Sequence, residues 1–197
     1  MVLKQSVSDE SKRYLKIISD ETSRLERILE EILGYVKTDE PQSMSPCGIN
    51  DLLNSCIEML YRQLKTYKIT IKRNFDQKIP TIICNQDQIK QVLLNVMING
   101  VESMRRKGEL TIESSINHNY VFIKIIDTGV GIKEEHIGNI FKAFFTTKSS
   151  GVGLGMNVSK KIIEQHSGRI EVTSEYGKGT TFTIMLPIRG KEGKHGK

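Results

Sequence analysis

Apolar residues recur at three- and four-residue spacing over the first 36 positions of the chain. Between Val7 and Val36 there is no proline and the first glycine is Gly34, so the spacing predicts one long helix with Ser8 at its N-cap. The apolar stripe consists of Leu15, Ile18, Leu25, Ile28, Leu29, Ile32, Leu33 and Val36. Such a stripe must be buried, and we expect a coiled-coil-like helical partner, with a homodimer through residues 15–36 as one form of it. Packing on the chain's own domain is the alternative.

The pattern changes after residues 38–48, a polar stretch with two prolines that indicates a linker. Helical spacing then predicts a helix from Asp51 to about Lys65, with Asn50 as its N-cap, and a helix from Gln86 to Met104, capped by Asn85. Alternating positions and turn residues predict the remaining elements. These are strands at Ile69–Phe75 and Thr81–Cys84, hairpins of Leu110–Ile116 with Tyr120–Ile126 and of Arg169–Ser174 with Thr180–Leu186, and shorter helices at Glu134–Phe141 and Met156–Gln165.

The composition, 38% hydrophobic and 26% charged, is typical of a soluble globular protein. No apolar run approaches the roughly 20 residues of a membrane-spanning helix, and no secretory signal is visible, so we expect a cytoplasmic location, with any membrane anchor in parts not present here. Three cysteines without metal-ligand spacing are expected to be reduced packing residues. The tail at residues 189–197, expected to be disordered, carries four basic residues and one acid and so half of the net charge of +6. The charge therefore favours no nucleic-acid partner.

A polar turn follows the strand that begins at Tyr120. The strand ends at Asp127, and Gly129 and Gly131 follow. A carboxylate at the end of a buried strand accepts hydrogen bonds in a fixed direction, and the glycines let backbone approach a ligand closely. At this point a plain turn after an edge strand explains the residues equally well.

Two further features can hold a phosphate-bearing ligand. Asn95 and Asn99 share one face of the Gln86–Met104 helix, and an amide oxygen suits Mg²⁺, unless these side chains are exposed or bond backbone. The run Ser150-Gly-Val-Gly-Leu-Gly155 precedes a helix, whose first N–H groups attract phosphate; a flexible loop is the alternative. The run is neither a Walker A motif nor a dinucleotide fingerprint.

The order of these motifs is more specific than any one of them. Along the chain come Asn95-x-x-x-Asn99, Asp127-x-Gly129-x-Gly131, Phe141-x-x-Phe144-Phe145, Gly151-x-Gly153-Leu154-Gly155 and Gly177-x-Gly179-Thr180. From Ile49 to Pro187 the chain resembles the ATP-binding catalytic domain of bacterial sensor histidine kinases, within the group shared with gyrase, Hsp90 and MutL. The resemblance implies a domain at residues 49–188 with an α/β fold, a two-layer sandwich of a mixed, mainly antiparallel sheet with helices on one face. It also implies that residues 1–37 are the second helix of the kinase dimerisation hairpin.

The same resemblance implies the adenine contacts. Asp127 matches the acid that accepts the adenine amino group, and Gly129 and Gly131 match the glycines that shape the pocket. Thr180 matches the threonine that completes the contact through a water molecule.

The phosphate contacts are implied in the same way. Asn99 matches the Mg²⁺ ligand, and Asn95 the polar residue one turn earlier, to which we assign a catalytic part together with Lys148. Lys148 lies where a cation of the nucleotide lid would meet phosphate. Two further sets match the family: Gly151, Gly153, Leu154 and Gly155 for the second glycine box, and Phe141, Phe144 and Phe145 for the aromatic box.

Some positions depart from the family pattern. Val152 stands where threonine is common, and Glu102 stands where some of these kinases carry a phosphate-binding lysine. The substitutes for that lysine are Arg105, Arg106 and Lys148. The lid between Phe145 and Gly151 is short, as in the nitrogen-regulation subgroup.

The chain also lacks the family's phosphoacceptor, a histidine followed by an acid in the setting His-Glu-x-x-Asn-Pro. Its four histidines are His118 in a hairpin turn, His136 and His166 on helix surfaces, and His195 in the tail. We therefore expect transfer of the γ-phosphate of ATP to a histidine outside this chain, with acceptor helices and a response regulator as partners.

Two other functions fit the same motifs. One is a nucleotide-binding module without turnover, and the other is a protein-serine kinase or an ATPase of the same superfamily. The ATPases carry a glutamate as general base at the position of Asn95, and its absence here disfavours water activation.

Overall fold

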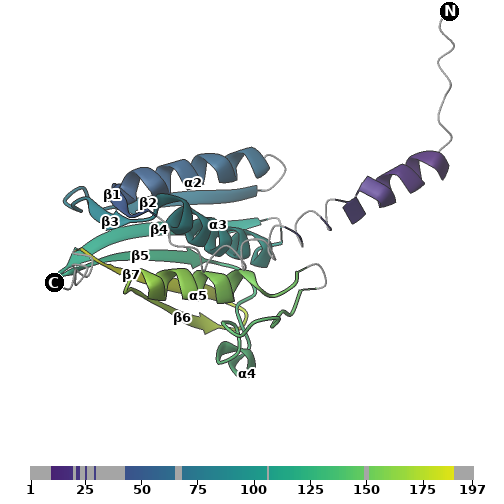
Figure 1. Cartoon of the computed structure of the whole chain (residues 1–197). Helices are drawn as coiled ribbons and strands as arrows, with labels where there is room; N and C mark the ends of the chain where they lie inside the picture. The colour runs from purple at the N-terminus through teal and green to yellow at the C-terminus, as the bar shows by residue number, and fades with distance from the viewer. Residues whose placement is uncertain are drawn as a thin grey trace, which may run out of the picture.

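The computed structural model describes residues 10–19, 21–22, 25, 29, 43–64, 68–105, 107–148 and 151–188. Residues 10–19 are helical, as the long-helix prediction requires, and lie apart from the sheet (Figure 1). In this segment the apolar side chains of Tyr14, Leu15, Ile17 and Ile18, and also those of Leu25 and Leu29 further along the chain, are 53–61% exposed. Beyond residue 19, the structure describes only residues 21–22, 25 and 29 of the predicted helix, and these are helical. The predicted basic tail at residues 189–197 lies outside the described residues.

A five-stranded sheet runs in the order β2-β4-β5-β7-β6. Its strands are β2 (Lys68–Phe75), β4 (Lys107–Asn117), β5 (Tyr120–Asp127), β7 (Gly179–Pro187) and β6 (Arg169–Glu175). The pair β2–β4 is parallel, and the three other pairs are antiparallel. Both predicted hairpins, β4–β5 and β6–β7, are confirmed, and the sheet is mixed and mainly antiparallel as expected.

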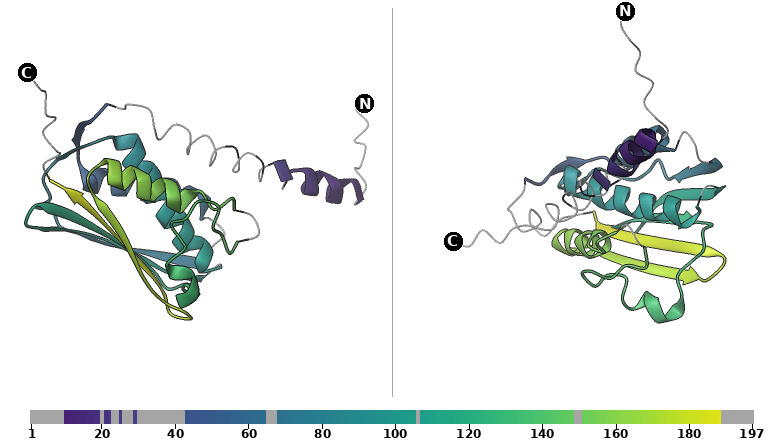
Figure 2. Two further views of the ribbon diagram at one scale, coloured as in Figure 1. Left: turned by 60° about the horizontal axis from the view of Figure 1, so that its bottom comes forward. Right: turned by 90° about the vertical axis from the view of Figure 1, so that its right-hand side faces the viewer.

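Three helices cover one face of this sheet (Figures 1 and 2). They are α2 (Ile49–Gln63), α3 (Gln86–Ser103) and α5 (Gly155–Gln165), and a short helix, α4 (Glu134–Ile137), lies near the β6 end. The N-cap prediction for α3 is confirmed, because the Asn85 side chain accepts a hydrogen bond from the Gln88 N–H at 2.9 Å. The two-layer arrangement is the one that the sequence led us to expect.

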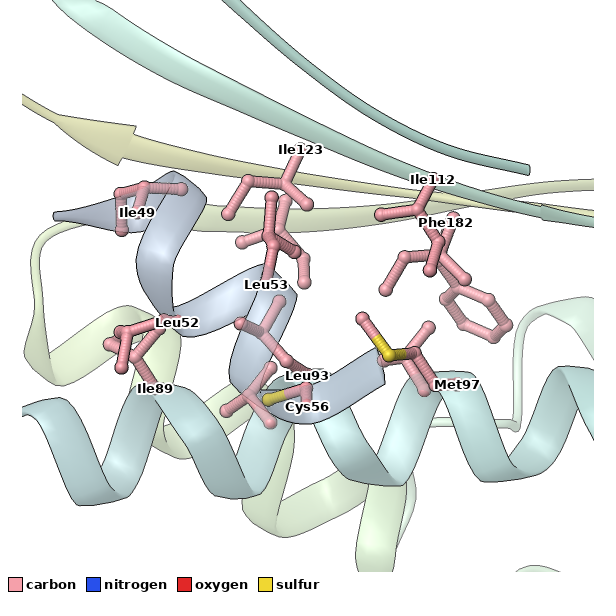
Figure 3. Close-up of a cluster of buried hydrophobic side chains, with 14 of the residues drawn as sticks. Ile49, Leu52, Leu53, Cys56, Ile89, Leu93, Met97, Ile112, Ile123 and Phe182 are labelled. Atoms are coloured by element: carbon pink, nitrogen blue, oxygen red, sulfur yellow. The ribbon is translucent and has the colours of Figure 1, made fainter. Parts of the chain in front are cut away.

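The core fills the space between α2, α3 and the sheet (Figure 3). Every second residue of β5 and β7 faces the helices, so the strands bury one row of apolar side chains each. The side chains labelled in Figure 3 are Ile49, Leu52, Leu53 and Cys56 of α2, Ile89, Leu93 and Met97 of α3, and Ile112, Ile123 and Phe182 of the sheet. Burying each large apolar side chain contributes about 1.5–3 kcal/mol, so this layer fixes the position of α3 on the strands.

Three local predictions differ from the structure. The helix predicted at Glu134–Phe141 is shorter and ends at Ile137 as α4. Residues 45–47, predicted as part of a linker, form β1 (Ser45–Cys47), which pairs antiparallel with β3 (Ile82–Cys84) and buries Cys47. Asn50 does not cap α2: the helix begins at Ile49, two residues before the predicted start at Asp51, with Gly48 at its N-cap position, because Ile49 is buried in the core. The Asn50 side chain instead joins the sheet, donating to the Asp76 carbonyl at 2.9 Å and accepting from Ser114 at 2.7 Å.

The three cysteines, Cys47, Cys56 and Cys84, are buried free thiols, as predicted. Burial raises the pKa of Cys56 to about 11, which keeps that thiol protonated. Among the described residues, no helix combines the length and apolarity that crossing a membrane requires.

Candidate nucleotide-binding site

Asp127 is the last residue of β5 and is buried, with 5% of its surface exposed. It lies between Thr180 of β7 and Leu110 of β4 in the sheet, and its side chain faces α3. The contact with α3 depends on Gly100, where an added Cβ would come within 3.3 Å of Asp127 Cβ and 2.9 Å of a Leu110 methyl. A glycine in α3 thus allows the strand carrying the carboxylate to approach the helix closely.

Two donors meet the same carboxylate oxygen, Asp127 Oδ1. The Ser103 hydroxyl donates to it at 2.8 Å, and the Gly129 N–H donates at 2.8 Å. Burial raises the pKa of Asp127 above its ordinary value, and these two donors, the Thr180 backbone and the positive charge of Lys148 oppose that rise. The side chain is therefore held in one orientation by neighbours that favour its ionised form.

The turn after β5 is fixed by close backbone contacts. A Cβ at Gly129 would lie 1.9 Å from Ser103 Oγ, and Gly131 has φ +68° with the Glu175 carbonyl 2.2 Å from a Cβ built there. The Ile132 N–H donates to Ser174 Oγ at 2.8 Å, which ties the turn to β6. Only glycine fits at Gly129 and Gly131, so the sequence prediction that both shape a site has a steric basis.

The predicted pair of asparagines lies on α3 where this helix faces the start of α5. Asn95 Nδ2 donates to the Gly155 carbonyl at 3.3 Å and lies 3.4 Å from Ser159 Oγ. Asn99 Nδ2 lies 3.1 Å from the Met156 sulfur. The structure thus brings the asparagine face and the second glycine box together, although the two are about 60 residues apart in sequence.

Lys148 lies at the same place. Its Nζ donates to Asn99 Oδ1 at 2.6 Å and to Glu102 Oε2 at 2.6 Å. Both the Lys148 and Glu102 side chains are partly solvent-exposed. An amide oxygen and a carboxylate oxygen therefore already converge on one positive charge, and hard oxygen donors of this kind also suit Mg²⁺.

The glycine box leads into a helix end without a side-chain cap. Gly153 has φ +78°, and a Cβ there would lie 2.5 Å from the Phe145 carbonyl. Leu154 is buried at the N-cap position and makes no side-chain capping bond, so the first N–H groups of α5 have no capping side chain. At Gly151 a Cβ would meet only Thr146 Oγ1, at 3.5 Å, and packing there does not require glycine.

The three phenylalanines of the aromatic box differ in their surroundings. Phe141 and Phe145 pack against the core, whereas Phe144 is 70% exposed and has φ +64°. Thr180 is buried, with its hydroxyl 3.0 Å from that of Ser174. A part for Phe144 in nucleotide binding stays a prediction.

Sequence reasoning missed Ser103 and Ser174. Ser103 follows Asn99 by four residues, just as Asn99 follows Asn95, so the polar face of α3 could have been extended by one more turn. Ser174 lies in a strand with ordinary alternation, and no local pattern distinguishes it.

One histidine prediction is wrong in detail. His166 was placed on a helix surface but is buried at the end of α5, because it joins this helix to the start of α3. Its Nε2 accepts from the Asn85 N–H at 3.0 Å, and its Nδ1 lies 2.8 Å from the Ile162 carbonyl. His118 lies in the β4–β5 turn and His136 in α4, as predicted, and His195 lies outside the described residues.

A family model, a curated relative and two solved structures show what this chain is similar to. The family model described as "Histidine kinase-, DNA gyrase B-, and HSP90-like ATPase" matches residues 84–190. Sporulation kinase E of Bacillus subtilis (strain 168) is 35% identical over 191 residues, which make up 95% of this chain and 26% of that protein. The chain thus spans about a quarter of the length of this curated relative.

Two solved structures of the histidine kinase ThkA share the fold. The catalytic domain has a TM-score of 0.70 at 28% identity and covers 75% of this chain and 97% of that chain. ThkA in complex with the response regulator protein TrrA has a TM-score of 0.76 at 29% identity, over 94% of this chain and 54% of that chain.

Proposed function

This chain belongs to the histidine kinase-, DNA gyrase B- and HSP90-like ATPase family, and we propose that it is the ATP- and Mg²⁺-binding catalytic part of a two-component sensor histidine kinase. One observation carries the proposal. The buried Asp127 carboxylate packs on α3 at Gly100, and the neighbouring residue, Asn99, directs its amide oxygen at a positive charge. A group for recognising a base and a group for holding a cation are thus set side by side on one helix.

In this proposal Asp127 accepts a hydrogen bond from the adenine amino group. Ser103 and Gly129 support this assignment, since both donate to Oδ1 and so fix the orientation of the carboxylate before ligand binds. Thr180, opposite Asp127 in the sheet, would complete the contact through water. Gly131, where a Cβ would meet the Glu175 carbonyl at 2.2 Å, lets the turn after β5 lie close to the end of β6 and so would help to shape the adenine pocket.

The phosphates would lie between α3 and the start of α5. Asn99 would hold Mg²⁺, which would supply positive charge to neutralise the phosphate oxygens. The uncapped first turn of α5, entered through Gly151, Gly153, Leu154 and Gly155, offers N–H groups to the same oxygens. Lys148 can turn its ammonium toward phosphate, because its side chain is 39% exposed.

The reaction would transfer the γ-phosphoryl group from ATP to an imidazole nitrogen and release ADP. This chain's residues would orient the triphosphate and offset the charge that develops during transfer. Asn95 donates its amide to the start of α5 and, unlike a carboxylate, cannot accept a proton from water, which supports transfer over hydrolysis. None of the chain's histidines, His118, His136, His166 and His195, is followed by an acid, so the acceptor would be a histidine of another chain or segment.

Two partners follow from this proposal. The exposed apolar residues of the N-terminal helix, among them Leu15 and Ile18, would pack in a homodimer or against acceptor helices. A response regulator would receive the phosphoryl group from histidine, and the ThkA–TrrA complex is a relative's example of such a pair.

The decisive experiment mixes the purified chain with an acceptor-histidine fragment and ATP labelled at the γ-phosphate. We expect acid-labile label on the fragment and none on a matched fragment in which alanine replaces the acceptor histidine. Acid-stable label would indicate a serine kinase. Binding of nucleotide without transfer of label would indicate a nucleotide-binding module without turnover.

A further inference from the structure

Asn99 and Glu102 form an oxygen pair at the end of α3. They are three residues apart and therefore share a helix face. Lys148 Nζ lies 2.6 Å from Asn99 Oδ1 and 2.6 Å from Glu102 Oε2. These are short, charge-assisted hydrogen bonds, and one ammonium group makes both of them. The two oxygens therefore belong to a single cation position.

The charge of Glu102 gives this position its significance. A carboxylate three residues beyond the proposed Mg²⁺ ligand would repel a triphosphate unless a cation stays beside it. Lys148 is the cation that the structure places there, and it comes from a segment 46 residues further along the chain. When a nucleotide binds, either Lys148 must stay beside Glu102 or another cation must take the place of Lys148.

We propose that Asn99 Oδ1 and Glu102 Oε2 form one cation site for which the Lys148 ammonium and a divalent cation compete. The proposal rests on the nucleotide site proposed above and adds Glu102 to it as a ligand, direct or through water. Mg²⁺ prefers oxygen at about 2.0–2.1 Å, roughly half an ångström closer than the present contacts. The Glu102 side chain is 43% exposed and has room for such a shift.

This competition couples binding of the metal ion to the position of the Lys148 ammonium. A divalent cation at this site releases Lys148 Nζ from Asn99, and the released ammonium is then available to a phosphate oxygen. Because both binding events draw on the same two oxygens, removing the lysine should strengthen metal binding and removing the carboxylate should weaken it.

The test measures binding of Mn²⁺ alone, by electron paramagnetic resonance of the free ion, to the full chain and its variants without nucleotide. Lys148→Met should bind Mn²⁺ about fivefold more tightly than the unsubstituted chain, the change expected when an exposed ion pair no longer competes. Glu102→Gln should bind it more weakly, and the double variant should show no gain over Glu102→Gln. Lys142→Met, which removes an equal charge from an exposed position outside the pair, is the control.

Two results would overturn the proposal. One is Mn²⁺ affinity in Lys148→Met that is unchanged or no higher than in Lys142→Met. The other is undiminished affinity in Glu102→Gln. Calorimetric titration with ADP in the presence and absence of metal separates this failure from failure of the proposed function. ADP binding without the predicted Mn²⁺ pattern refutes the shared cation site alone, whereas no ADP binding under either condition refutes the nucleotide site.

Discussion

Replacing Asp127 with asparagine tests the proposed base recognition with little change in shape. The substitution exchanges one carboxylate oxygen for an NH₂ group and removes the negative charge. In the structure both internal donors, Ser103 Oγ and the Gly129 N–H, meet Oδ1 at 2.8 Å. The asparagine oxygen should keep these two bonds, and its NH₂ group then takes the position of Oδ2.

The expected loss of binding free energy follows from the orientation of the asparagine amide. The NH₂ group would point a donor at the adenine amino group, which is itself a donor, so one hydrogen bond to a charged acceptor is lost and a buried donor stays unpaired. Such a change costs about 1–3 kcal/mol of binding free energy. The dissociation constant for ADP should therefore rise about 5- to 150-fold.

Stability should respond differently from affinity. Because burial raises the pKa of Asp127, protonation favours the folded state, and this contribution is lost as pH rises through the raised pKa. A neutral amide avoids that loss, so the thermal midpoint of Asp127→Asn at neutral pH should equal or exceed that of the unsubstituted chain. The difference should shrink below the ordinary aspartate pKa of about 3.9.

Isothermal titration calorimetry with ADP and with inosine diphosphate separates a loss of adenine recognition from a general disruption of the binding site. Inosine carries an oxygen where adenine carries the amino group, so the asparagine NH₂ can donate to it. The variant should lose affinity for ADP and gain preference for inosine diphosphate. Unchanged ADP affinity, or an equal loss for both nucleotides, would refute the assignment of Asp127 to the adenine amino group.

Two further substitutions test packing contacts, one at the turn after β5 and one at the end of α5. Gly129→Ala should lower the free energy of unfolding by about 1–3 kcal/mol and weaken nucleotide binding, because its Cβ would lie 1.9 Å from Ser103 Oγ. Gly138→Ala, with nothing within 4 Å of its Cβ, is the matched control, and equal effects in urea titrations would contradict the steric argument. Burial lowers the pKa of His166, so the stability that its neutral ring provides is present above the ordinary value of about 6.5 and is lost as pH falls through the lowered pKa. His166→Gln should lower the free energy of unfolding by about 1–3 kcal/mol at neutral pH. It should also make that free energy fall less steeply as the pH is lowered. Urea titrations at several pH values measure this, and a fall as steep as in the unsubstituted chain would contradict the prediction.

The local pattern of the sequence was enough to predict most elements. The β-branched and aromatic residues of positions 120–126 predict β5, and a capping asparagine before an apolar stripe predicts α3 to within one residue. Motif order along the chain led to the family, because the order of motifs does not depend on how the elements pack. The start of α2 was harder to predict, since burial of Ile49 outweighed the capping preference of Asn50.

The chain's own sequence determined which residues could form a nucleotide site: a carboxylate after a strand, two amides on one helix face and glycines before a helix. Only the tertiary structure decided that Ser103 holds Asp127, that Lys148 joins Asn99 to Glu102, and that His166 is buried. These contacts span 24 to 81 residues of sequence. They depend on how α3 and α5 dock on the sheet, and that docking is set by burial of the whole apolar layer rather than by any local pattern.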